Sequence, residues 1–186
     1  MPEETSEIIL NAALKIFAEE GYVGAKTRII AKEAGFSEMT LFRKFKSKEN
    51  LFDRVLFEQK EQILREIHTI LKENKIEDPI MSLSYLIRQI YKLIEDNFPF
   101  ISIYINENRR MSECILDEFI IHLAEEIELR YPKINLNTKI LAFNILSFLY
   151  MLVFDKYKNY SIINHEEALN ELIDYLITIL AHNFVF

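Results

Sequence analysis

The sequence predicts an all-helical protein, with a small three-helix N-terminal domain, a larger helical body and about nine helices in all. Half of the 186 residues are hydrophobic, yet the chain has only three glycines and four prolines. Turn residues as scarce as these favour a few long helices over many short strands. Apolar residues also recur at spacings of three and four, which is the period of a helix with one buried face.

The first helix is expected over residues 6–20. Thr5 or Ser6 is expected to cap its start, since a hydroxyl at that position accepts a bond from a free backbone N–H. Gly21 follows the helix and suits the left-handed conformation that often ends one. The apolar stripe of this helix consists of Ile9, Ala13, Ile16 and Phe17.

A helix-turn-helix is expected next, from helices over residues 27–34 and 38–45. Gly35 ends the first of them, because a tight turn is cheapest for a residue without Cβ. Ser37 can cap the second, and Ala31 is small enough to let the two helices cross closely. Such a pair of short helices around a glycine turn is typical of this motif. The inward side chains of the second helix are expected to be Leu41 and Phe45.

The rest of the chain is expected to form six more helices. Ser47 can cap the first of these and Asp78 the second, with Pro79 in its first turn. We therefore expect two domains, residues 1–47 and 48–186. The six helices are expected over residues 48–73, 79–97, a short stretch ending near 106, 112–131, 137 or 138 to 157, and 164 or 165 to 183.

The last two helices are more apolar than a single small body needs. Residues 137–157 are apolar nearly all the way round, so this helix has to be covered on every side. Residues 164–183 carry an apolar stripe wider than one neighbour would cover. The simpler interpretation is that both are central helices of the body. The interpretation favoured here is a homodimer in which these two helices form the self-complementary contact.

Basic residues are concentrated in one short segment. The whole chain carries a net charge of −7, but residues 24–48 hold seven basic and two acidic side chains. That segment is therefore +5 and the remainder −12. Such a patch draws a polyanion to one face and repels it elsewhere. On charge alone, a solvated basic face without a partner stays the alternative.

The sequence is not typical of a secreted or membrane protein. Its single cysteine, Cys114, cannot form an internal disulfide, which fits a reducing compartment. The first residues, MPEETSE, lack the basic and then apolar order of a secretion signal. The longest apolar run, residues 145–154, is about half of the roughly 20 residues that a membrane helix needs. We expect a soluble, cytoplasmic protein without a membrane partner.

Catalytic, cofactor and metal motifs are missing from the sequence. It has no GxGxxG, P-loop or GxSxG pattern, and HEEAL (165–169) lacks the second histidine of HExxH. The histidines are scattered, and acidic doublets such as Glu19-Glu20 occupy adjacent helical positions that point apart. We therefore expect no enzyme, no cofactor and no metal site.

Four stretches near the N-terminus form one pattern. They are Phe17 to Gly21, TRIIAKEAGFS (27–37), TLFRKF (40–45) and SKENL (47–51), about a quarter of the chain. In this pattern the sequence resembles the TetR-type regulators of bacteria and archaea. The resemblance implies a three-helix DNA-binding head and a body that binds a ligand and forms the dimer. The remaining three-quarters matches that family only in length and helicity.

The resemblance also implies which residues meet DNA. Thr27 and Lys48 look like phosphate contacts, and Arg28 looks like a base or phosphate contact. Met39, Thr40 and Arg43 lie where the family's recognition helix faces bases. Phe42 departs from the family, which usually has a tyrosine there whose hydroxyl reaches a phosphate. A phenylalanine packs instead on sugar or on a thymine methyl. The full expected set is Thr27, Arg28, Ser37, Met39, Thr40, Phe42, Arg43, Lys44 and Lys48.

The function that the resemblance implies is ligand-responsive repression. A dimer presents two recognition helices, so its double-stranded DNA operator should be a pseudo-palindrome with half-sites about 34–36 Å apart. A small hydrophobic effector would release it from that operator. Two alternatives stay open, a helix-turn-helix that docks on protein and a regulator that binds DNA constitutively without an effector.

The effector is expected to bind among aromatic residues of the body. Small-molecule pockets are mainly apolar with a few polar groups. Most of these aromatic residues must be ordinary core residues, and only some of them would line the pocket. Arg109 or Arg110 is the expected partner if the ligand is anionic. The candidate lining residues are Tyr85, Phe98, Tyr104, Arg109, Phe119, Asn144 and Phe148.

Overall fold

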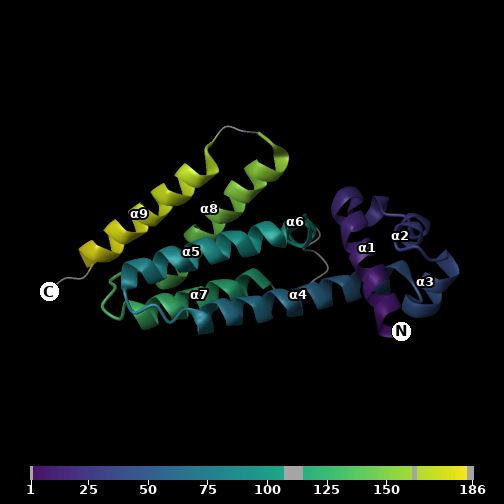
Figure 1. The fold of residues 1–186 in the computed structure, drawn as a ribbon, viewed down its shortest axis with the longest axis horizontal. Coiled ribbons are helices and arrows are strands. Elements are labelled where there is room, and N and C mark those ends of the chain that lie inside the picture. Colours follow the sequence, from purple (N-terminus) through teal and green to yellow (C-terminus); the bar gives the residue numbers. More distant parts are fainter. Residues whose placement is uncertain (1, 107–114, 161–162, 184–186) are drawn as a thin grey trace. The chain divides into compact units, whose positions relative to one another are not determined.

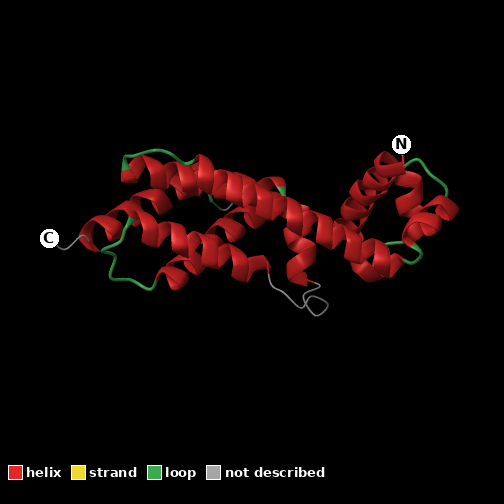
Figure 2. Cartoon of the chain, turned by 90° about the horizontal axis from the view of Figure 1, so that it is seen from below, coloured by secondary structure: helices red, strands yellow, loops and turns green. Residues whose placement is uncertain are grey.

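The computed structural model describes residues 2–106, 115–160 and 163–183. Within these ranges every regular element is a helix (Figure 1), and Figure 2 shows the loops that join them. The predicted all-helical fold class is confirmed. The helices are α1 (Pro2–Gly24), α2 (Thr27–Glu33), α3 (Glu38–Phe45), α4 (Lys48–Glu73), α5 (Pro79–Asp96), α6 (Phe98–Asn106), α7 (Ile115–Arg130), α8 (Thr138–Lys158) and α9 (His165–Asn183).

Most helices begin where the sequence predicted, because a polar side chain caps the first turn. In each case the side chain accepts a bond from a backbone N–H three residues later, which satisfies one of the free donors of a helix N-terminus. The bonds run to Ser37 from Thr40 (3.2 Å), to Ser47 from Asn50 (3.0 Å), to Asp78 from Met81 (2.8 Å), to Asn137 from Ile140 (3.1 Å) and to Asn164 from Glu167 (3.2 Å).

The first helix differs from its prediction. α1 begins at Pro2, so Thr5 and Ser6 lie inside it and the predicted cap at these residues is wrong. Proline suits a first helical turn, where its missing N–H costs nothing. Gly21 does adopt a positive φ, 67°, which interrupts the helix before a short continuation to Gly24. The start predicted for α7, at residue 112, lies outside the described residues.

The described chain divides into two compact units. The first holds residues 2–63 with 97–106, and the second holds residues 64–96 with the described residues from 115 to 183. α4 contributes its first part to one unit and its last part to the other. Compactness alone defines these units, so the functional boundary predicted after residue 47 stays a prediction.

The first unit is packed around one face of α1. Ile9, Ala13 and Phe17 of the predicted stripe are buried there. The Phe17 ring meets Phe52 of α4 edge-on, with 4.8 Å between centroids, and Tyr22 lies at the same distance from Phe52. Edge-to-face aromatic pairs add to the gain from apolar burial. This cluster fixes the end of α1 against the beginning of α4, and α2 and α6 also pack on α1.

The second unit is built around α8, which contacts α5, α7 and α9. The side that α8 buries consists of Thr138, Ala142, Ile145, Leu146, Leu149, Leu152 and Val153. The opposite side is exposed in the single chain and is also apolar. Its members are Ile140, Phe143, Phe148 and Met151. By length and composition α8 could cross a membrane, although 39% of its apolar window is buried inside the chain.

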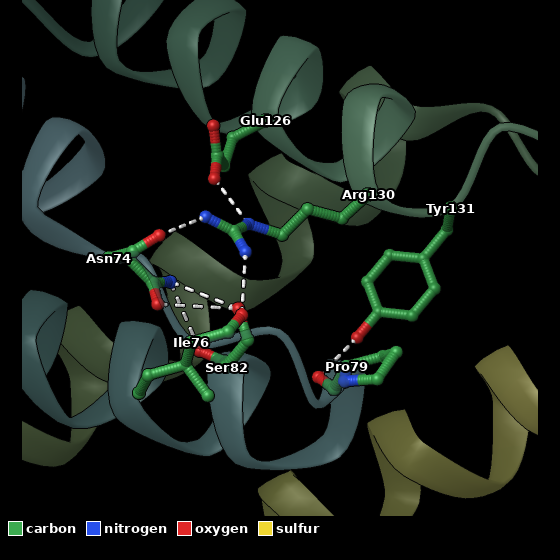
Figure 3. Close-up of polar contacts among 7 residues, drawn as sticks. All are labelled: Asn74, Ile76, Pro79, Ser82, Glu126, Arg130 and Tyr131. Atoms are coloured by element: carbon green, nitrogen blue, oxygen red, sulfur yellow. Dashed lines mark hydrogen bonds and ion pairs between the residues drawn. The ribbon is translucent and has the colours of Figure 1, made fainter.

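A polar cluster fixes the connection between α4 and α5 (Figure 3). The Arg130 guanidinium, at the end of α7, donates to the carbonyl oxygens of Asn74 (2.7 Å) and Ile76 (3.5 Å). The same guanidinium pairs with the Glu126 carboxylate one turn earlier. The buried Asn74 amide donates to Ser82 Oγ of α5 at 3.1 Å. Because the acceptors are backbone carbonyls, this cluster fixes the backbone path of the connector as well as the positions of its side chains.

Candidate nucleic-acid interface

The predicted helix-turn-helix is present as α2, a turn over residues 34–37, and α3. Gly35 in the turn has a φ of 75°, a conformation that costs glycine little. Ala31 is buried where the two helices meet, and its carbonyl accepts a bond from the Phe36 N–H at 2.8 Å. Leu41 faces inward as predicted, and Phe45 is half-buried. The motif therefore holds one face of α3 against the unit and leaves the other free.

The free face of α3 is a narrow ridge of four side chains, Met39, Phe42, Arg43 and Lys46. Spacings of three and four place Met39, Phe42 and Arg43 on one side of the helix. Lys46 follows as the residue that ends the helix, and its Nζ donates to the Arg43 carbonyl at 3.2 Å. Met39 is 79% exposed and Phe42 39% exposed, and both cations are exposed as well. We call these four residues the α3 ridge. It combines two apolar side chains with two positive charges.

Three of the other predicted DNA contacts are engaged inside the unit. The Ser37 and Thr40 hydroxyls lie 3.0 Å apart and share a hydrogen bond. Lys44 Nζ donates to Ser6 Oγ of α1 at 3.2 Å, so this side chain reaches toward α1. Their polar groups are thus less available to a base edge than the α3 ridge.

The predicted phosphate contact Thr27 has a partner that the sequence did not reveal. Its Oγ1 donates to Glu38 Oε1 at 2.6 Å, which ties the start of α2 to the start of α3. A carboxylate in a first turn is favoured by the helix dipole. The same carboxylate places a negative charge beside a hydroxyl that is expected to meet a phosphate.

Lys48, the other predicted phosphate contact, is positioned by the end of α1. Its Nζ lies 4.8 Å from the centroid of the Tyr22 ring and donates to the Val23 carbonyl at 3.4 Å. A cation over an aromatic face is attracted by the ring electrons. Lys48 is also the first residue of α4, and a helix N-terminus favours anions. Tyr22 was missed because its role depends on a contact 26 positions along the chain.

The remaining cations of the patch lie on and just before α2. Arg28 is exposed, as are Lys26 and Lys32. Lys15 of α1 is paired with Glu33 of α2 at 2.6 Å, and this hydrogen-bonded carboxylate raises the pKa of the lysine. That pair places one acidic side chain of the segment against α1.

The predicted effector residues are distributed over both units. Phe98 and Tyr104 are buried in α6 of the first unit, and Tyr85 is half-buried on α5 of the second. Phe119 lines a cavity of about 10 Å³ among α4, α5 and α7, enough for one water at most. Arg109 lies outside the described residues, as does Arg110. The set as a whole stays a prediction.

A larger hollow lies on the surface of the second unit. It is an open groove of about 840 Å³ between α8 and α9, and its lining is mostly apolar. Two predicted effector residues, Asn144 and Phe148, line it together with Ile140 and Tyr175. Because the groove lies on the two helices predicted to dimerise, it is a candidate for the dimer contact as well as for the effector site.

Residues 9–55 match the family model described as bacterial regulatory proteins, tetR family. The N-terminal segment of this chain belongs to the TetR family. The match spans most of α1, all of α2 and α3, and the beginning of α4. The resemblance carried by the N-terminal motifs is thereby confirmed. This family is a class of regulators and not of enzymes.

Relatives and solved structures agree with that assignment. YvkB of Bacillus subtilis, an uncharacterized HTH-type transcriptional regulator, is 40% identical over 52 residues, which is 28% of each chain. The chain thus matches little more than a quarter of that relative's length. FadR from Bacillus subtilis in complex with stearoyl-CoA has a TM-score of 0.69, with 20% identity over 93% of this chain and 98% of that one. AibR in complex with isovaleryl coenzyme A and operator DNA has a TM-score of 0.68, with 16% identity over 91% and 96%. At such identities the two structures show a shared fold.

Proposed function

We propose that this protein is a transcriptional regulator of the TetR type, a dimeric repressor that binds a pseudo-palindromic DNA operator. The observation that carries the proposal is the α3 ridge, an exposed recognition surface inside a +5 segment of an otherwise acidic chain. A helix in the major groove supplies sequence information, and Lys and Arg contacts to phosphates supply most of the affinity. A DNA-binding repressor acts beside the chromosome, so a cytoplasmic location is part of this proposal.

The proposed phosphate contacts are Arg28 and Lys48, with Thr27 as a neutral donor. Lys48 supports this role best, because Tyr22 and the Val23 carbonyl already orient its ammonium at the start of a helix. A side chain ordered before binding loses less conformational entropy when the phosphate arrives.

The proposed dimer contact is the exposed apolar side of α8 together with the groove between α8 and α9. A second copy of this chain is the proposed occupant, since a two-fold contact of a surface with itself needs no further partner. It would cover Phe143, Phe148 and Met151, which the single chain leaves exposed. We assign Asn144 and Phe148 to this contact and not to the effector site. If a second copy covers this surface, the apolar character of α8 is explained and no membrane is needed to explain it.

The proposed effector is a small molecule with an apolar chain. Two proteins that share the fold were crystallised with acyl-CoA molecules, one with stearoyl-CoA and one with isovaleryl coenzyme A. The apolar cavity beside Phe119 is the proposed entry point for the chain of such a ligand, and binding would require α4, α5 and α7 to part. Because α4 belongs to both units, it is one covalent path by which this change would weaken DNA binding.

The DNA proposal is tested by titrating the full-length protein with its own upstream DNA and with random DNA at two salt concentrations. We expect preference for one sequence and a log–log salt slope of about −0.9 per phosphate contact. Arg43→Ala should remove about 1–3 kcal/mol of specific affinity for each half-site. Lys92→Ala, which removes one exposed cation from α5, is the matched control and should change little. Absence of any salt-sensitive DNA binding would contradict the proposal and favour a protein-docking role for the α3 ridge.

The effector proposal is tested separately, by thermal shift with acyl-CoAs of increasing chain length and with free coenzyme A as control. We expect the unfolding temperature to rise with chain length and operator affinity to fall with the same ligands. Stabilisation by free coenzyme A alone, or by none of the series, would contradict an apolar effector while leaving the DNA proposal intact.

A further inference from the structure

The apolar half of the α3 ridge remains exposed in the unit, with Met39 79% and Phe42 39% exposed. Met39 and Phe42 point away from the buried side of α3, which is occupied by Leu41. Met39 lies in the first turn of α3, the part of a recognition helix that contacts base edges in helix-turn-helix complexes. Two adjacent apolar side chains on a basic surface therefore stand where base contacts are made.

Hydrogen-bonding side chains near this position already have partners within the unit. The Thr40 and Ser37 hydroxyls bond to each other, and the Thr27 hydroxyl bonds to Glu38. Arg43 is left as the principal side chain of the α3 ridge able to bond to a base. The exposed parts of Met39 and Phe42 can contribute only through apolar contact.

The major groove offers one apolar group, the C5 methyl of thymine. We propose that Met39 and Phe42 recognise thymine methyl groups, next to a guanine that Arg43 binds through its O6 and N7 atoms. This inference rests on the proposed DNA-binding function and adds the base composition that the half-site must have. Burying one methyl is worth about fourfold in affinity, or about fifteenfold for two equivalent half-sites.

The test begins with selection of binding sequences from a random duplex library by the full-length protein. Each thymine of the selected operator is then replaced by deoxyuridine, which lacks the methyl but keeps the same base pairing. We expect a fall in affinity of about fourfold at one or two positions per half-site, adjacent to a guanine. Replacement at the other thymines should have little effect.

A cycle of protein and DNA changes then assigns the contact. In Met39→Ala and Phe42→Ala, deoxyuridine at the matching position should no longer weaken binding, because the side chain that touched the methyl is gone. Met39→Gln provides a second variant of similar size with a polar end. Both residues are exposed, so the variants should fold, which far-ultraviolet circular dichroism checks.

The outcomes separate this inference from the proposed function. Sequence-specific binding that is insensitive to deoxyuridine overturns the inference alone. Sensitivity that persists unchanged in both alanine variants also overturns it, because the methyl would then act through DNA shape. Failure to bind DNA at all overturns the inference together with the proposed function.

Discussion

Lys46 connects α3 to α4 in an unusual backbone conformation. Its φ is 67° and its ψ is −43°, and the Ser47 N–H donates to the Phe45 carbonyl at 2.8 Å across it. This is a γ-turn of the strained kind, which side chains other than glycine rarely adopt. The strain lets α3 end and α4 begin within two residues, with the Lys46 side chain on the exposed ridge.

Lys46→Gly should therefore stabilise the protein and weaken its binding to DNA. Relief of the turn should raise the free energy of unfolding by about 1 kcal/mol, after allowing for the extra entropy of unfolded glycine. Loss of the cation should reduce the salt slope of DNA binding by about 1 for each protomer of the proposed dimer. Lys46→Ala is the matched control, because it removes the same charge and keeps the strained turn. Equal stability of the two variants, measured by urea unfolding, would contradict strain at this residue.

The Thr27–Glu38 hydrogen bond places a carboxylate where a phosphate is expected. Glu38→Gln removes that charge and keeps a side chain of the same shape. We expect DNA affinity to rise by about fivefold for each half-site, the effect of about 1 kcal/mol between charges near 4 Å in water. Glu33→Gln is the control, since it makes the same change in net charge at a carboxylate held by Lys15. If both variants gain equally in fluorescence anisotropy titrations, the effect belongs to net charge and not to Glu38.

At the scale of elements, the connector between α4 and α5 depends on the end of α7. Besides the contacts of Arg130, the Tyr131 hydroxyl donates to the Pro79 carbonyl at 2.7 Å. Burial raises the pKa of this hydroxyl, which keeps it a neutral donor. The two residues thus hold three backbone carbonyls, those of Asn74, Ile76 and Pro79.

Arg130→Leu should destabilise the protein by about 2 kcal/mol. The change leaves the largely buried Glu126 carboxylate without its cation and two carbonyls without a donor. The chain offers a matched control in Arg54, which forms an exposed ion pair with Glu58 four residues away. Arg54→Leu should cost less than about 0.5 kcal/mol. Comparable shifts of the urea midpoint in the two variants would contradict a special role for the α7 cluster.

At the scale of the whole molecule, the apolar surface of α8 and α9 should determine the oligomeric state. Phe148→Glu introduces a charge into the proposed two-fold contact, at a cost of several kcal/mol if the carboxylate is buried unpaired. We expect a monomer by sedimentation velocity and a large loss of affinity for a palindromic operator. Leu129→Glu on α7 is the control, because it places the same charge on an apolar residue that is 76% exposed. A monomeric wild-type protein would contradict the dimer directly.

The sequence by itself determined the helices and most of their ends. Ser37, Ser47 and Asp78 each cap a helix by accepting a bond from the backbone N–H three residues later. The turn at Gly35 follows from its lack of a Cβ. Signals of this kind involve only neighbouring residues, so they do not depend on how the rest of the chain packs. The cap predicted at Thr5 or Ser6 was wrong because the residues before them are also helical, and the helix begins at Pro2.

Only the tertiary structure decided how the predicted site residues are used. Glu38 engages Thr27, Ser6 engages Lys44, and Tyr22 positions Lys48, all through contacts between different helices. The helical period alone indicates which face of a helix is apolar, but not which polar atoms meet across a crossing. For the same reason the sequence predicted an α8 that is apolar all round, and only packing against α5, α7 and α9 left one side of it exposed.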